Sequence, residues 1–246
     1  MTYISNKDFW LEVVKGNVAG HVAINKFGIN PDIDTGTTED LWTVGGTWVA
    51  PTSATTVNIV SSSVNDTAVG TGARTITVNG LNGSYADTTE TITLNGTTNV
   101  TTVNSYFIIH TMTVGTAGSG ATNAGTISTT WTGGGTPVGP SIIIGSAQTQ
   151  FCIYQIPAGY TAYMYRYQGG MQNGTSADLK LYIKPFGGVF NIKGELALSA
   201  SGTSYSTRDY ALPLVITEKS IVKIVGTVTA NNTEVHASFD IILVAN

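Results

Sequence analysis

The sequence has few charged side chains, and this shortage limits the chemistry that the protein can perform. Charged residues make up 11% of its 246 residues, against roughly 25% in an average soluble domain. Between Leu41 and Gln150 only four charged side chains occur, and these are Asp66, Arg74, Asp87 and Glu90. Because this segment is rich in Thr, Gly, Asn and Ser but poor in acids, bases and metal ligands, it favours a structural role over catalysis.

Cysteine, long apolar runs and clustered positive charge are also scarce. The only cysteine, Cys152, cannot form an internal disulfide, and its apolar neighbours predict a small buried side chain. No run reaches the ~18 apolar residues of a membrane span, and Met1 to Ser5 lacks the features of a signal peptide. The 11 Lys and Arg residues form no cluster. We therefore expect neither a membrane nor a nucleic acid among the partners.

The first forty residues differ from the rest, because they hold a helix signal and a larger share of charge. Ser5 can cap a helix with Asp8 as the capping-box acid, and Gly16 can end it. The apolar face of this helix would consist of Phe9, Trp10, Val13 and Val14. We interpret residues 1–40 as an N-terminal arm. The alternative is a helix that closes one end of a β barrel or sandwich.

The middle of the chain has the pattern of short antiparallel strands. Runs rich in Thr, Val and Ile are separated by the pairs Asn79-Gly80, Asn82-Gly83 and Asn95-Gly96, which supply the positive φ angles of hairpin turns. This pattern predicts a Thr/Gly/Asn-rich β domain over residues 41–132. Residues 133–140 combine four glycines with two prolines and predict a linker.

The last part of the chain has longer and more aromatic strands. Apolar and polar residues alternate in segments such as Ser238 to Ile241, so each strand has one buried face. Seven or eight such strands over residues 141–246 predict a jelly-roll-like β-sandwich. The apolar end at Leu243 and Val244 predicts a central position for the last strand. The fold class is therefore all-β with a short N-terminal helical arm.

No catalytic or metal-binding pattern stands out. His21, His110 and His236 lie in different predicted elements, no Gly-x-Ser-x-Gly motif occurs, and no pattern selects a pair of acids for glycan hydrolysis. Asp32 and Asp34 could converge on calcium in a loop, although the full calcium-loop pattern is absent and a solvated acidic loop is the alternative. We expect a non-enzymatic protein without a cofactor or metal.

Aromatic side chains provide the best candidates for a contact surface. Tyr163, Tyr165 and Tyr167 alternate along one predicted strand and would share one side of it. This stripe could pack in the core or against another subunit. Together with the helix, the candidate residues for docking or subunit contact are Phe9, Trp10, Val13, Val14, Tyr163, Tyr165 and Tyr167.

Several segments of the sequence resemble those of known proteins. The most specific one includes Asn65-Asp66-Thr67 and continues to Gly70-Thr71-Gly72-Ala73-Arg74. The set comprises residues 8–17, 26–30, 61–76, 90–96 and 231–240. Together these segments resemble a widespread family of tailed-bacteriophage virion structural proteins, and the resemblance spans nearly the whole chain.

This resemblance implies a place on the virus particle. Members of the family are described as head-decoration, head-fibre or minor capsid components, and no catalytic residue is carried over from them. The implied partners are the major capsid protein or other virion proteins, together with further copies of this chain. A trimer is favoured by analogy, because a capsid offers three-fold positions. The implied location is the virion, assembled in the host cytoplasm.

Two other functions are compatible with the sequence. A tail fibre or adaptor protein could bind a host surface glycan through aromatic residues such as Trp42 and Trp48. A polysaccharide-degrading spike would additionally need two acids close together. Docking to a shell requires neither of these features.

Overall fold

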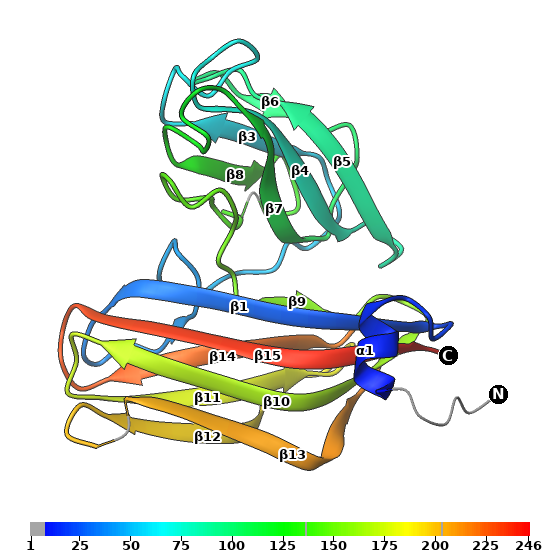
Figure 1. Cartoon of the computed structure of the whole chain (residues 1–246), viewed down its shortest axis with the longest axis vertical. Helices are drawn as coiled ribbons and strands as arrows, with labels where there is room; N and C mark the ends of the chain where they lie inside the picture. Colours follow the sequence, from blue (N-terminus) through cyan, green and yellow to red (C-terminus); the bar gives the residue numbers. More distant parts are fainter. Residues whose placement is uncertain (1–7, 136, 203) are drawn as a thin grey trace.

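The computed structural model describes residues 8–135, 137–202 and 204–246 and is nearly all β. Antiparallel strands form two bodies, a long sandwich and a second β domain above it (Figure 1). The described part of the chain contains one α-helix, α1 (Phe9–Val14). Ser5, the expected helix cap, lies outside the described residues. Asp8 occupies the N-cap position instead, where its side chain accepts a hydrogen bond from the Trp10 N–H at 3.0 Å.

The sandwich consists of two packed sheets. The front sheet has the order β1, β15, β10, β13, and the back sheet has the order β12, β11, β14, with β2 and β9 both paired to β14. The bounds of the front strands are β1 (His21–Ile33), β10 (Tyr160–Gln172), β13 (Tyr205–Ile216) and β15 (Thr233–Ala245). Those of the back strands are β2 (Glu39–Asp40), β9 (Ile153–Gln155), β11 (Ser176–Lys184), β12 (Asn191–Ser199) and β14 (Ile221–Val228).

This strand order is that of a jelly roll, in which the chain passes repeatedly from one sheet to the other. Alternating apolar residues of β15, such as Val235, Phe239 and Leu243, face the core between the sheets. As expected from its apolar end, β15 lies centrally, between β1 and β10. The predicted β-sandwich is confirmed, but it includes strands from the start of the chain.

The edge position of the back sheet, beside β14, is divided by a long insertion. Asp40 of β2 pairs with Val225, and Ile153 of β9 continues along the same strand by pairing with Lys223. The two halves meet where the Cys152 N–H donates to the carbonyl oxygen of Leu41 at 2.9 Å. The expected arm over residues 1–40 is therefore wrong for residues 21–40. Alternation in β1 is interrupted near the end by Pro31, and the sequence alone did not reveal its pairing with β15.

The inserted domain contains two three-stranded sheets with a shared core. The first sheet consists of β3 (Val57–Ser61), β6 (Val100–Thr101) and β8 (Ile127–Trp131). The second consists of β4 (Ala73–Leu81), β5 (Asp87–Thr93) and β7 (Ile108–Ala117). Asn82-Gly83 lies in the β4–β5 connection as expected, whereas Asn79-Gly80 continues β4 and is not a turn.

Residues 133–140 do not connect the two domains. The chain folds back here along β8, so that the Gly139 N–H donates to the carbonyl oxygen of Thr129 at 3.0 Å. Ile142, beyond this segment, is buried in the core of the inserted domain. The glycines and prolines form a turn because the flanking apolar residues complete a core. The chain returns to the sandwich near Phe151, which bridges to Trp42 on the outgoing segment.

A third apolar cluster joins the two domains. It consists of Trp42, Trp48, Leu81, Ile108, Phe151, Ile153 and Ile221. Polar groups cross the same junction, since the buried Lys26 ammonium of β1 donates to the carbonyl oxygen of His110 in β7. The His110 ring stacks on Tyr154 with centroids 4.1 Å apart and accepts a hydrogen bond from the Gln155 N–H at 3.2 Å.

Candidate docking surface

The helix α1 exposes its apolar side chains. Four of its residues are large and half-exposed or more: Phe9 at 47%, Trp10 at 47%, Leu11 at 48% and Val14 at 70%. Glu12 and Val13 are the buried ones. A surface helix normally turns its polar face to water. This inverted arrangement is typical of a segment that another surface covers.

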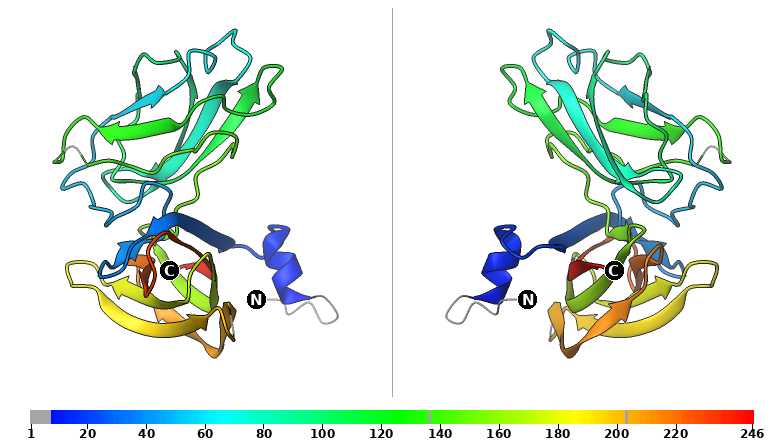
Figure 2. Two further views of the ribbon diagram at one scale, coloured as in Figure 1. Left: turned by 90° about the vertical axis from the view of Figure 1, so that its left-hand side faces the viewer. Right: turned by 90° about the vertical axis from the view of Figure 1, so that its right-hand side faces the viewer.

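The position of α1 leaves a groove beside the front sheet. Views from the two sides show the helix standing out from the sandwich (Figure 2). The Trp10 ring contacts Tyr165 edge-on, with ring centroids 4.2 Å apart. The groove has a volume of about 880 Å³ and is lined by α1, the start of β1, and parts of β10, β13 and β15.

Strand register organises the outer surface of the front sheet beside α1 into two rows. One row, which we call the apolar row, crosses all four strands as Ala23, Ile242, Tyr163 and Val215. The next, the charged row, consists of Asn25, Asp240, Arg166 and Asp209. Arg166 donates to Asp240 at 2.6 Å, and this hydrogen bond raises the pKa of the guanidinium. We call the apolar row and α1 together the candidate docking surface.

The predicted tyrosine stripe is divided by a β-bulge. The register of β10 shifts between Met164 and Arg166 against both neighbouring strands. As a result Tyr163 and Tyr165 are partly exposed, whereas Tyr167 is fully buried in the sandwich core, where burial raises its pKa to about 12. A bulge adds one residue to a strand and reverses which face the following side chains take. Tyr167 is therefore a core residue.

The structure thus brings part of the predicted set together. Trp10, Val13 and Val14 line the groove together with Tyr165, and Phe9 contacts Trp10 edge-on with ring centroids 5.6 Å apart. Tyr163 lies in the apolar row and does not line the groove. Sequence reasoning missed Val215, which is 59% exposed at the end of the apolar row. The alternation of side chains along β13 could have indicated that Val215 is exposed. Its place beside Tyr163, however, depends on the order of the strands in the jelly roll, which the sequence alone does not give.

The other residues discussed from the sequence lie elsewhere. Trp42 and Trp48 are buried in the domain junction, so they cannot form an exposed glycan-binding face. Cys152 is buried, as predicted, and burial raises the pKa of its thiol to about 12, which leaves it unreactive at neutral pH. The Asp34 carboxylate accepts a hydrogen bond from the Asn232 N–H at 3.1 Å.

Within residues 8–135, 137–202 and 204–246, no group of three or more His, Cys, Asp or Glu residues is arranged to hold a metal ion. Over the same residues, no helix is long and apolar enough to cross a membrane.

Comparison with known proteins gives no close relative. No protein-family profile matches the chain, and no curated protein matches it. Among solved structures, the structure of infectious bursal disease virus Gx strain is 12% identical, with a TM-score of 0.25, over 92% of this chain and 73% of that chain. The crystal structure of the infectious bursal disease virus VP2 subviral particle is 11% identical, with a TM-score of 0.22, over 92% and 72% of the two chains. Likenesses with such low TM-scores carry no argument about function.

Proposed function

We propose that this chain is a non-enzymatic bacteriophage virion structural protein, namely a decoration, cement or head-fibre component that binds the capsid shell and self-associates. The main observation behind the proposal is the exposed apolar surface of α1. Its partner would be the major capsid protein or another virion protein, and the assembled form would be a homo-oligomer, with a trimer favoured. Its location would be the virion, assembled in the host cytoplasm.

Three further observations support this function. Viral capsid proteins are among the proteins that use the jelly roll, although a fold by itself does not determine function. The low charge leaves a surface that does not repel neighbouring copies. The sequence resemblance to phage virion proteins includes residues 8–17, which contain α1.

In this proposal α1 and the apolar row attach the protein to the capsid shell. Burying half-exposed Phe, Trp and Leu side chains against a shell would gain roughly 25 cal/mol for each Å² of apolar surface removed from water. Because α1 projects beyond the sandwich, it can reach a neighbouring protein without any change in the two β domains. The inserted domain would then project from the particle or contact adjacent subunits.

A set of matched triple variants tests the proposal. Phe9→Ser, Trp10→Ser and Leu11→Ser together remove the apolar surface of α1 at positions that are about half exposed. The control is Val49→Ser, Val64→Ser and Val69→Ser, three exposed apolar residues outside α1 and the apolar row. We expect the first variant to fold but to fail to co-sediment with particles that lack the protein, while the control still binds. Equal binding by both variants would contradict the role of α1.

A further inference from the structure

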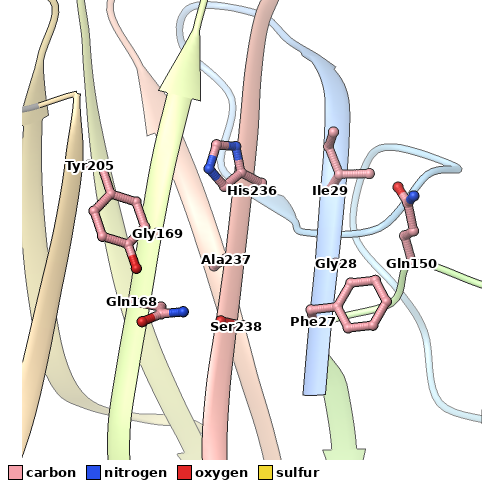
Figure 3. Close-up of a pocket in the computed structure, with 10 residues that line it drawn as sticks. All are labelled: Phe27, Gly28, Ile29, Gln150, Gln168, Gly169, Tyr205, His236, Ala237 and Ser238. Carbon is pink, nitrogen blue, oxygen red and sulfur yellow. The ribbon is translucent and has the colours of Figure 1, made fainter. Parts of the chain in front are cut away.

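A second hollow lies on the outer surface of the front sheet, away from α1. It has a volume of about 260 Å³ and is lined by residues of β1, β15, β10 and β13 together with Gln150 (Figure 3). Four positions of β1 separate Ala23 in the apolar row from Phe27, the nearest residue of the hollow on this strand, which is roughly 13 Å along the strand. The charged row lies between them, and the hollow shares no lining residue with the groove beside α1.

Small residues make the floor of this hollow. Gly170 of β10 pairs with His236 of β15, and a Cβ atom at position 170 would lie 2.5 Å from the His236 Nε2 atom. A side chain at position 170 would therefore force the imidazole to move from its place across β10. Two residues further along β15, Ser238 pairs with Gln168 of β10 and supplies another small side chain.

Aromatic rings stand at opposite ends of the hollow. Tyr205, on the edge strand β13, is 49% exposed, and Phe27, on β1, is 37% exposed. Two strands separate β13 from β1, so the strands that carry the rings are about 14 Å apart across the sheet. Figure 3 shows Tyr205 at one side of the hollow and Phe27 at the other, with Gln168 and His236 between them.

The polar groups of the hollow are uncommitted. Within the described part of the chain, the side chains of Gln150, Gln168, His236 and Ser238 form no hydrogen bond with another residue. None of the residues that line the hollow is an acid, a lysine or an arginine. Amide, imidazole and hydroxyl groups between two aromatic rings suit a ligand that is neutral, rich in hydroxyl groups and apolar on its ring faces.

We propose that this hollow is a binding site for a neutral saccharide whose rings lie across the strands between Tyr205 and Phe27. The aromatic rings stack on the sugar faces, while Gln168, His236 and Ser238 exchange hydrogen bonds with the sugar hydroxyls. This site goes beyond the proposed structural function, because it would let a virion-bound protein hold a carbohydrate. It replaces the buried Trp42 and Trp48 as the aromatic residues for such binding.

The test uses the isolated full-length chain and a panel of neutral and anionic oligosaccharides, followed by calorimetric titration of the best ligand. Tyr205→Ala and Gln168→Ala change side chains at the surface of the hollow, and Leu212→Ala changes an 86% exposed residue of the same edge strand outside it. We expect binding of at least one neutral oligosaccharide, weakened at least tenfold by Tyr205→Ala and by Gln168→Ala but unchanged by Leu212→Ala. Binding should also be insensitive to salt, because no charged group lines the hollow.

Three results would overturn the site. These are no binding of any neutral oligosaccharide, binding of anionic oligosaccharides alone, and neutral binding that both hollow variants retain. Because no virus particle takes part in this experiment, its failure would leave the proposed docking through α1 untouched. Conversely, loss of particle binding by the α1 variant would leave the saccharide site untouched.

Discussion

At the scale of single residues, one buried carboxylate holds the loops of the inserted domain. Asp66 is fully buried and accepts hydrogen bonds from the N–H groups of Ala73, Ala124 and Gly125 at 2.7, 2.8 and 2.9 Å. It also accepts one from the Ser61 hydroxyl at 2.5 Å. The carboxylate thereby connects segments that are far apart in the sequence, which explains the presence of an acid in such an uncharged region.

Replacing this carboxylate should destabilise the inserted domain strongly. Asp66→Ala leaves three backbone N–H groups and one hydroxyl without their acceptor, and we expect a loss of about 3 kcal/mol or more in the free energy of unfolding. Denaturant titration measures this loss. Asp178→Ala, which removes an exposed carboxylate of β11, is the control and should change stability little. Equal effects of both substitutions would contradict the role assigned to Asp66.

His110 makes the domain junction sensitive to acid. The pKa of His110 lies well below its usual value of 6.5. Burial of the ring is the main cause, and the positive charge of the nearby Lys26 ammonium is the second. The folded state therefore keeps the ring neutral, while the unfolded state takes up a proton as the pH falls below that value. The contribution of the neutral His110 ring to the free energy of unfolding is therefore fully present above about pH 6.5 and decreases as the pH falls below that value.

The expected loss is about 1 kcal/mol between pH 6.5 and 5.5, and it approaches about 1.4 kcal/mol for each further pH unit below 5.5. His110→Gln removes the titrating group and should reduce the slope of unfolding free energy against pH by that amount. The buried Asp40, whose pKa is raised mainly by burial, acts in the opposite direction in both proteins, so the difference between their slopes isolates His110. Identical slopes would show that the His110 ring is accessible to protons in the folded state.

At the scale of elements, we expect α1 to be needed for assembly and to contribute little to folding. The triple serine variant at positions 9–11 should change the free energy of unfolding by less than about 1 kcal/mol, because these side chains are already half exposed. Its mass by light scattering should nevertheless be that of a monomer under conditions in which the unmodified chain self-associates. A large drop in stability would show instead that α1 belongs to the core of the sandwich.

The sequence was informative about elements and less so about their partners. Alternation in β15 and the aromatic strand β10 predicted a sandwich, and the apolar end at Leu243 predicted a central strand. The pairing of β1 with β15 depends on residues some two hundred positions apart and has no local signal. The bulge after Met164 likewise has no local signal, and it separates Tyr167, which lies in the core, from the partly exposed Tyr163 and Tyr165.

At the scale of the whole molecule, the inserted domain and the jelly roll share buried side chains. Phe151 packs against Trp42 and Trp48, with ring centroids 5.9 and 5.8 Å apart, at the point where the chain returns to the sandwich. The Gly-Pro segment at residues 133–140 suggested a flexible connection, but composition cannot reveal that both crossing segments pass through an apolar cluster. We therefore expect the two domains to unfold together.

Phe151→Ala should uncouple them. Truncating this buried ring costs about 3 to 5 kcal/mol, and we expect the single calorimetric transition of the unmodified chain to divide into two. Leu212→Ala, at an apolar residue of β13 that is 86% exposed, should leave one transition. Two transitions in the unmodified chain would contradict a shared junction.

The proposed docking depends on where α1 lies on an assembled particle. A density map of intact particles that carry this protein would show its position. We expect density for the jelly roll on the shell, with Phe9, Trp10 and Leu11 buried against a capsid protein or a neighbouring copy. Density for this chain on the tail alone, or on the shell with α1 exposed to solvent, would contradict the proposed docking.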